Sequence, residues 1–172
     1  MNLEDPMSRA KKRIMNACVD VAKSNRHSDA SGLLRGILFL AKEPISLEEL
    51  TEKTGYSKST VSSHMSFLES QGLVRRVITP GDKRYRYVPV IDPEALKDAM
   101  LKKLKKEVQL LLNALDGAEK DLEECTDDPD MVLSRVSAAR SSYKKTEELV
   151  NILSRYSSEE LLEMLKKNRS SP

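Results

Sequence analysis

The chain has 172 residues, of which 33% are charged and 4% are aromatic, and its net charge is +2. This composition favours a helix-rich protein over a β-sandwich or barrel, and the length allows one large domain or two small ones. No apolar run approaches the roughly 18 residues that a membrane-spanning helix needs, and the first residues lack the apolar core of a secretory signal. We therefore expect a cytoplasmic protein with no membrane partner.

The two cysteines, Cys18 and Cys125, lie far apart in the sequence, and neither has a second cysteine or a histidine at metal-ligand spacing. A disulfide framework and a metal site are therefore not expected. We interpret each as a buried reduced thiol, with a redox-sensing thiol as the alternative. The chain also lacks a glycine-rich phosphate loop and a clustered nucleophile and base, so we expect neither a cofactor nor enzymatic activity.

Positive charge is concentrated in the middle of the chain. Residues 1–55 hold 9 basic and 8 acidic side chains, residues 56–91 hold 6 and 2, and residues 92–172 hold 14 and 17. The excess within residues 56–91 indicates a polyanionic partner for this segment.

Two helices are predicted ahead of Pro44. The first runs from about Pro6 to Asn25 and carries an apolar stripe formed by Ile14, Cys18, Val21 and Ala22. A basic cluster precedes the stripe and is either a solvated face or a phosphate or partner contact; its members are Arg9, Lys11, Lys12 and Arg13. The second helix, around residues 33–41, is apolar over most of its circumference and should lie at the centre of a core.

A pair of short helices follows. Ser46 and Glu49 have the spacing of a capping box, and the helix they begin should stop near Thr54, with Gly55 as a left-handed cap. Ser57 can cap the next helix. Two short helices joined by a tight glycine-containing turn form a helix-turn-helix arrangement.

The second of these helices, over residues 57–72, has two contrasting faces. Val61, Met65 and Leu68 fall within roughly 60° of each other on a helical wheel, whereas the opposite face carries short hydroxyls. His64 lies beside the apolar face, where a packed or solvated histidine is favoured over a pH switch. Hydroxyls can contact base edges or phosphates, so this face is the candidate recognition surface. Its residues are Ser57, Lys58, Ser59, Thr60, Ser62, Ser63 and Ser66, with Lys58 the best candidate for a direct base contact.

A basic hairpin is predicted after Gly72. Residues 73–79 and 84–90 have the β-branched and aromatic content of strands, and Pro80-Gly81 marks the turn between them. A hairpin directly after a helix-turn-helix is a wing, and its positive charges suit DNA phosphates. The candidate wing contacts are Arg75, Arg76, Lys83, Arg84 and Arg86.

The last half of the chain is predicted to be helical. Apolar residues follow a 3.5-residue repeat over three heptads, the segment 127–130 breaks it, and a second long helix carries a similar seam. Two antiparallel helices bury such long seams most economically against an identical subunit, with an intramolecular bundle as the alternative. The predicted dimer interface comprises Leu101, Leu104, Val108, Leu111, Leu115, Leu122, Val136, Tyr143 and Val150.

These elements predict a mainly α fold with a small β-wing. A winged helix-turn-helix domain would occupy residues 1–91, and long antiparallel helices forming a dimerisation domain would occupy residues 92–172. Residues 45–77 together with the P-G-D-K-R-Y-R-Y segment resemble MarR-type transcriptional regulators, and the long helical second half resembles their GbsR-like branch.

The resemblance implies a homodimer that binds double-stranded DNA at a palindromic operator, with a small-molecule effector of unidentified nature as a further partner. It also implies that Asp82 orients an arginine, matched here by Arg84, toward the DNA backbone or minor groove. The competing interpretation is a winged helix that serves as a protein-interaction module in a larger assembly. It predicts an apolar or acidic recognition face and no basic excess in the wing.

Overall fold

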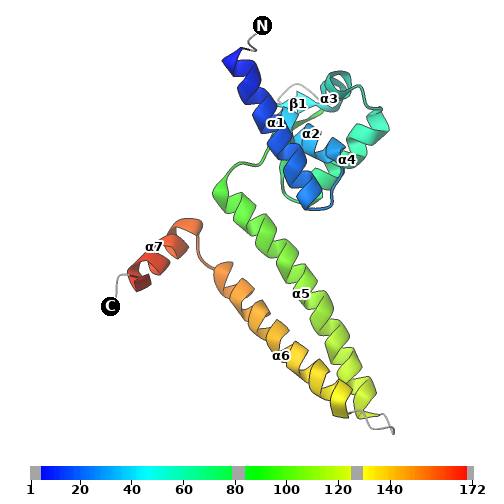
Figure 1. Cartoon of the computed structure of the whole chain (residues 1–172), viewed down its shortest axis with the longest axis vertical. Helices are drawn as coiled ribbons and strands as arrows, with labels where there is room; N and C mark the ends of the chain where they lie inside the picture. The colour runs from blue at the N-terminus through cyan, green and yellow to red at the C-terminus, as the bar shows by residue number, and fades with distance from the viewer. Residues whose placement is uncertain (1–4, 79–83, 125–129, 170–172) are drawn as a thin grey trace. The chain divides into compact units, whose positions relative to one another are not determined.

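The computed structural model describes residues 5–78, 84–124 and 130–169 (Figure 1). The chain divides into two compact units, Met1–Asp92 and Pro93–Pro172. The first unit contains four helices and a three-stranded sheet within the described ranges, and the second contains three helices. The fold is therefore mainly α with a small antiparallel sheet, as predicted from the sequence.

Two helices begin the first unit and pack against each other. Helix α1 covers Pro6–Ser24 and helix α2 covers Asp29–Phe39, with the Ser28 hydroxyl accepting the Ser31 amide at the start of α2. The predicted stripe on α1 is only partly correct. Ala22 is buried, but Val21 is 46% exposed, because successive residues of a helix point about 100° apart.

The helix-turn-helix is present where the sequence predicts it. Strand β1 is the short segment Ile45–Ser46, and helix α3 runs over Leu47–Thr54. Ser46 and Glu49 form the predicted capping box, and Gly55 has a φ of 71°, the left-handed conformation of a helix C-cap. Helix α4 then covers Lys58–Ser70, with Ser57 as its N-cap.

Strands β2, Val74–Ile78, and β3, Tyr85–Pro89, form the predicted hairpin, and their pairing is antiparallel. The short strand β1 pairs with the other edge of β3, which gives the strand order β1-β3-β2. The turn predicted at residues 80–83 lies outside the described residues.

The core of the first unit lies between α2, α3, α4 and the sheet. Val61, Met65 and Leu68 of α4, spaced four and three residues apart, contribute to this core and so fix the rotation of α4 about its own axis. The buried members are Leu34, Leu38, Ile45, Leu50, Val61, Met65, Leu68, Val74 and Tyr87. Large-to-small changes at such sites typically cost about 2–5 kcal/mol of stability.

The second unit is built on a helical hairpin. Helix α5, Pro93–Glu123, lies side by side with helix α6, Asp130–Leu153 (Figure 1). Val108 and Val150, two of the predicted interface residues, are already buried within this chain, together with Leu112. Leu112 was absent from the predicted seam because residues 110–112 are consecutive leucines, and the repeat alone does not decide which of them faces inward.

Helix α7, Ser158–Arg169, is attached to the first turn of α5 by polar contacts. Glu94 accepts hydrogen bonds from Lys97 and from the Ser158 amide, and Lys97 also donates to the Tyr156 carbonyl at 2.6 Å. The Lys97 ammonium and then the Ser158 amide lower the pKa of Glu94 to about 2. A second capping box lies at the start of α7, where the Ser157 hydroxyl accepts the Glu160 amide and the Glu160 carboxylate accepts the Ser157 amide.

Within the described ranges, no helix is long and apolar enough to cross a membrane. The same part of the chain contains no group of three or more histidine, cysteine or acidic residues that could hold a metal ion. Cys18 is a partly buried free thiol, and Cys125 lies outside the described residues.

Candidate nucleic-acid interface

Helix α4 separates an apolar face from a hydroxyl face. Val61, Met65 and Leu68 are at most 2% exposed, so the side of α4 opposite the core is fixed as the outward side. That side carries the exposed serines predicted from the sequence, which are Ser59, Ser62, Ser63 and Ser66. The rotation of α4 therefore follows from its buried side chains, and the serine face follows from that rotation.

The hydroxyls of α4 fall into two groups. At the start of the helix, the Ser57 Oγ accepts the Thr60 amide at 3.1 Å and lies within hydrogen-bond distance of the Thr60 and Ser59 hydroxyls. Further along, Ser62, Ser63 and Ser66 make no side-chain hydrogen bond to any other described residue. These later hydroxyls are the ones open to an external donor or acceptor.

Ion pairs hold one flank of α4. Lys58 Nζ lies 2.8 Å from Glu48 Oε1 on α3, and Arg76 of β2 lies 2.8 Å from Glu69 Oε2 near the end of α4. The hydrogen bond from Lys58 is the main cause that lowers the pKa of Glu48. Because the Lys58 side chain is 68% exposed, this ion pair contributes little to stability.

Both histidines of the chain hold the opposite flank of α4. The His64 Nδ1 lies 3.1 Å from the Ser31 hydroxyl and 3.4 Å from that of Ser28, the N-cap of α2. The His27 ring packs edge-on against Phe67, with the ring centroids 4.7 Å apart. His64 is thus a packed histidine, whereas the sequence had left a packed and a solvated histidine both open.

The predicted wing arginines have different environments. Arg75 is exposed and Arg84 is also exposed, whereas Arg86 has a side chain only 29% exposed. The Arg86 guanidinium donates to the Pro44 carbonyl at 3.0 Å and to Glu49 Oε2 at 3.2 Å, which connects β3 to the start of α3. The contacts of Arg86 are those of a residue that stabilises the fold.

Arg76 also has intramolecular partners in addition to its ion pair with α4. Its guanidinium lies 5.5 Å from the ring centroid of Tyr85 and 5.8 Å from that of Tyr87, within the range of cation–π attraction. Lys83 and Asp82, the remaining predicted wing residues, lie outside the described residues.

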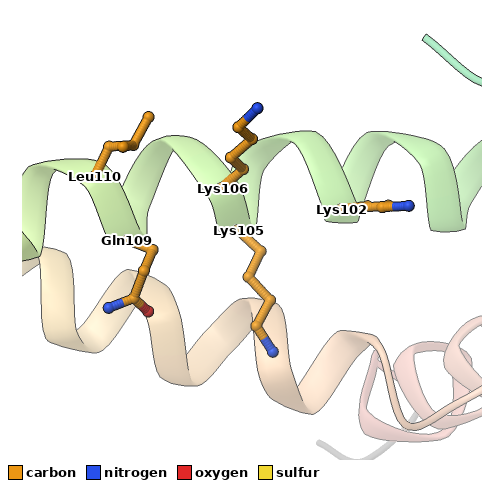
Figure 2. A pocket seen from close by; sticks show the side chains of 5 residues that line it. All are labelled: Lys102, Lys105, Lys106, Gln109 and Leu110. Carbon is orange, nitrogen blue, oxygen red and sulfur yellow. The ribbon is translucent and has the colours of Figure 1, made fainter. Parts of the chain in front are cut away.

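The second unit carries a basic surface that was not predicted from the sequence. Lys102, Lys105 and Lys106 on α5, with Gln109 and Leu110, line an open hollow of about 330 Å³ (Figure 2). The run L-K-K-L-K-K within residues 101–106 is the sequence signal for this surface. The unit as a whole has more acidic than basic residues, so its net charge does not show the local excess of lysines on α5.

The geometry of the first unit defines a winged helix-turn-helix domain, because α3 and α4 form the helix pair and β2 and β3 the adjoining wing. A model of the MarR family matches residues 35–84, which cover α3, α4, β1 and β2 and extend to the base of β3. The match covers less than a third of the chain.

Solved structures are similar over more of the chain. A crystal structure described as a transcriptional regulator has a TM-score of 0.63 and 21% identity, covering 86% of this chain and 97% of its own. An S. aureus MepR mutant bound to an oligodeoxyribonucleotide has a TM-score of 0.41 and 14% identity, covering 79% of this chain and 94% of its own. The first similarity supports the fold across both units. A comparison with curated proteins gives no match.

Proposed function

We propose that the protein is a sequence-specific regulator of transcription that binds double-stranded DNA as a homodimer. The observation that carries the proposal is the exposed hydroxyl face of α4 beside a basic hairpin, in a unit whose core fixes the orientation of both. The MarR family match over residues 35–84 supports a DNA-binding role for this unit. A second helix of a helix-turn-helix enters the major groove, and a wing contacts the adjacent backbone or minor groove.

The hairpin and α4 would make different contacts with DNA. Arg75 and Arg84, with Lys83, would neutralise phosphates and supply the salt-dependent part of the affinity. Ser62, Ser63 and Ser66 would contact base edges, directly or through water. Because hydroxyls can contact any base, much of the specificity would come from operator shape and half-site spacing.

The homodimer is proposed from the apolar surface of the second unit. The α5–α6 hairpin fully buries few large side chains, while Leu104 and Leu111 on α5 remain 40% and 43% exposed. These two leucines are seven positions apart, so they lie about 20° apart on the helix and form one stripe. A second copy covering this stripe would give a two-fold symmetric protein, which requires a palindromic operator.

The DNA-binding proposal is tested by selecting duplexes from a random pool and then titrating the enriched operator. We expect enrichment of a palindrome, and we expect Arg84→Ala to weaken binding to all duplexes and to lower the salt slope by about 0.9 per lost phosphate contact. Arg135→Ala, an exposed arginine of α6, is the matched control. Failure to enrich any palindrome, or an Arg84→Ala protein that binds like the control, would contradict the proposal.

The dimer is tested by sedimentation equilibrium on variants of α5. Replacing Leu104 and Leu111 together by glutamate should give monomers, because two charges would be placed in an apolar interface. Leu110→Glu is the matched control, since Leu110 is 61% exposed but lies about 100° or more around the helix from this stripe. Dimers in the double variant would show that the subunit interface lies elsewhere.

A further inference from the structure

The hairpin has two distinct faces, which follow from its strand register. Val74 is paired with Pro89, Arg76 with Tyr87, and Ile78 with Tyr85. Directly opposed residues of antiparallel strands point to the same side of the sheet, and positions two apart share that side. One face of the hairpin therefore carries all six of these side chains.

This face is the one that looks toward α4. Val74 and Tyr87 are buried in the core that α4 helps to form, and Arg76 reaches the Glu69 carboxylate of α4. Continuing along the same face, away from the core, the next cross-strand pair is Ile78 with Tyr85. The hydroxyl face of α4 and the Ile78–Tyr85 pair therefore belong to the same unit. The shared core fixes the orientation of both α4 and the hairpin.

The Ile78–Tyr85 pair is apolar but exposed. Ile78 is 70% exposed and Tyr85 is 53% exposed, although both have the residue types of a buried strand. The guanidinium of Arg76 lies 5.5 Å from the Tyr85 ring centroid, within the range of cation–π attraction, and it is also ion-paired with Glu69 of α4. The pair is thus an exposed apolar surface that shares its face of the hairpin with Arg76, whereas Arg75, which is paired with Val88, lies on the opposite face.

We propose that Ile78 and Tyr85 form a contact surface for the sugar–phosphate strand that borders the groove occupied by α4. This inference rests on the DNA-binding function proposed above and assigns it two further residues. Deoxyribose is the apolar part of the DNA backbone, so an aliphatic side chain and an aromatic ring can pack against it. The Tyr85 hydroxyl can donate to the adjoining phosphate, a contact that positions a protein on DNA without reading its sequence.

The charge beside the pair favours a DNA strand over an apolar protein surface as the binding partner. An apolar partner would have to desolvate the Arg76 guanidinium beside the Tyr85 ring, whereas a DNA strand supplies apolar sugar and anionic phosphate in alternation. Apolar side chains also contact or wedge into the minor groove in other DNA-binding proteins. A surface of this kind adds affinity that does not depend on salt, because no counterion is released when a sugar is covered.

The test uses the full-length protein and the duplex enriched by the wild type. Ile78→Thr keeps a β-branched residue in the strand, and we expect it to weaken binding roughly tenfold, as for a well-packed interface side chain. Tyr85→Thr should have an effect of similar size, and Tyr85→Phe should recover most of it except the phosphate contact. The salt slope should stay unchanged in the Ile78→Thr protein, in contrast to Arg84→Ala.

Phe39→Thr is the matched control, since Phe39 is 50% exposed but lies at the end of α2. Thermal unfolding would confirm that each variant is folded. If Ile78→Thr and Tyr85→Thr bind like the control while the wild type binds its operator, this inference is wrong and the proposed function stands. A change in oligomeric state instead of DNA affinity would assign the pair to a protein interface and overturn the inference. If the wild type enriches no duplex, both proposals fail.

Discussion

Replacing Gly32 by alanine should separate helix α1 from helix α2. Gly32 is buried in α2 at the point where α1 passes closest to it. A Cβ atom at this position would lie 2.6 Å from the Cα atom of Val19 and 2.8 Å from the Cys18 carbonyl oxygen. Both are backbone atoms of α1, so a side-chain rotation cannot relieve the contact.

The magnitude follows from two opposing effects. Non-bonded carbons prefer separations of about 3.5–4.0 Å, so α1 would have to retreat by about 1 Å. Such crowding costs about 1–3 kcal/mol, while alanine in place of glycine favours a helix by about 1 kcal/mol. The net expectation for Gly32→Ala is a loss of up to about 2 kcal/mol in the free energy of unfolding.

Two other helical glycines provide matched comparisons. A Cβ at Gly117 in α5 would meet nothing within 4 Å, so Gly117→Ala should stabilise its unit by about 1 kcal/mol. At Gly36 the nearest atom is the Met15 Sδ at 2.7 Å, the end of a flexible side chain, so Gly36→Ala should be close to neutral.

Urea unfolding followed by far-UV circular dichroism gives the three values. The order of stability should be Gly117→Ala above Gly36→Ala above Gly32→Ala. A Gly32→Ala protein as stable as the wild type, with Gly117→Ala stabilised as expected, would refute the close approach of α1 and α2.

Three further predictions concern polar contacts. Arg86→Met should lower the free energy of unfolding by about 1–3 kcal/mol, because it removes charge-assisted hydrogen bonds and leaves a carbonyl unpaired; a midpoint in urea equal to the wild type would contradict this. The pKa of Glu94 lies at about 2 in the folded protein, below its ordinary value of 4.5, so its stabilising effect is present above about pH 5 and is lost as the pH falls toward 2. Hydrogen exchange of α7 as a function of pH would show this loss, and Glu94→Gln should remove the pH dependence. Glu48→Gln should strengthen DNA binding severalfold, because it frees Lys58 for phosphate; unchanged affinity at low salt would show that the ion pair does not compete with DNA.

The structure of the first unit was predicted well because the sequence signals for it are local. The spacing of Ser46 and Glu49, the glycine at position 55 and the apolar triplet of α4 each depend on residues within one or two turns. The second unit was less predictable. Leu112 faces α6 while Leu111 is exposed, and three consecutive leucines fit either register until the partner helix is known.

The candidate site was predictable in composition but not in connectivity. The sequence showed that the hairpin is basic, but it could not show that Arg86 contacts Pro44, which is distant in the sequence. Ile78 and Tyr85 were predicted only to lie in strands, because their exposure depends on where the core ends. Tertiary contacts decide which basic residues stabilise the fold, and no local sequence pattern shows those contacts.

The ion pairs of α4 have a consequence for how affinity depends on salt. Its two charged end residues, Lys58 and Glu69, have partners on α3 and β2, so the outward face of the helix is a neutral surface of hydroxyls. Contacts from this face release few counterions, whereas contacts from the hairpin release them. The salt slope should therefore reflect the exposed cations of the hairpin, and it should be smaller than the six basic residues of 56–91 would suggest, because Arg86 contacts Pro44 and Glu49. Changes to the serines of α4 should in turn alter the preference among operators while leaving that slope in place.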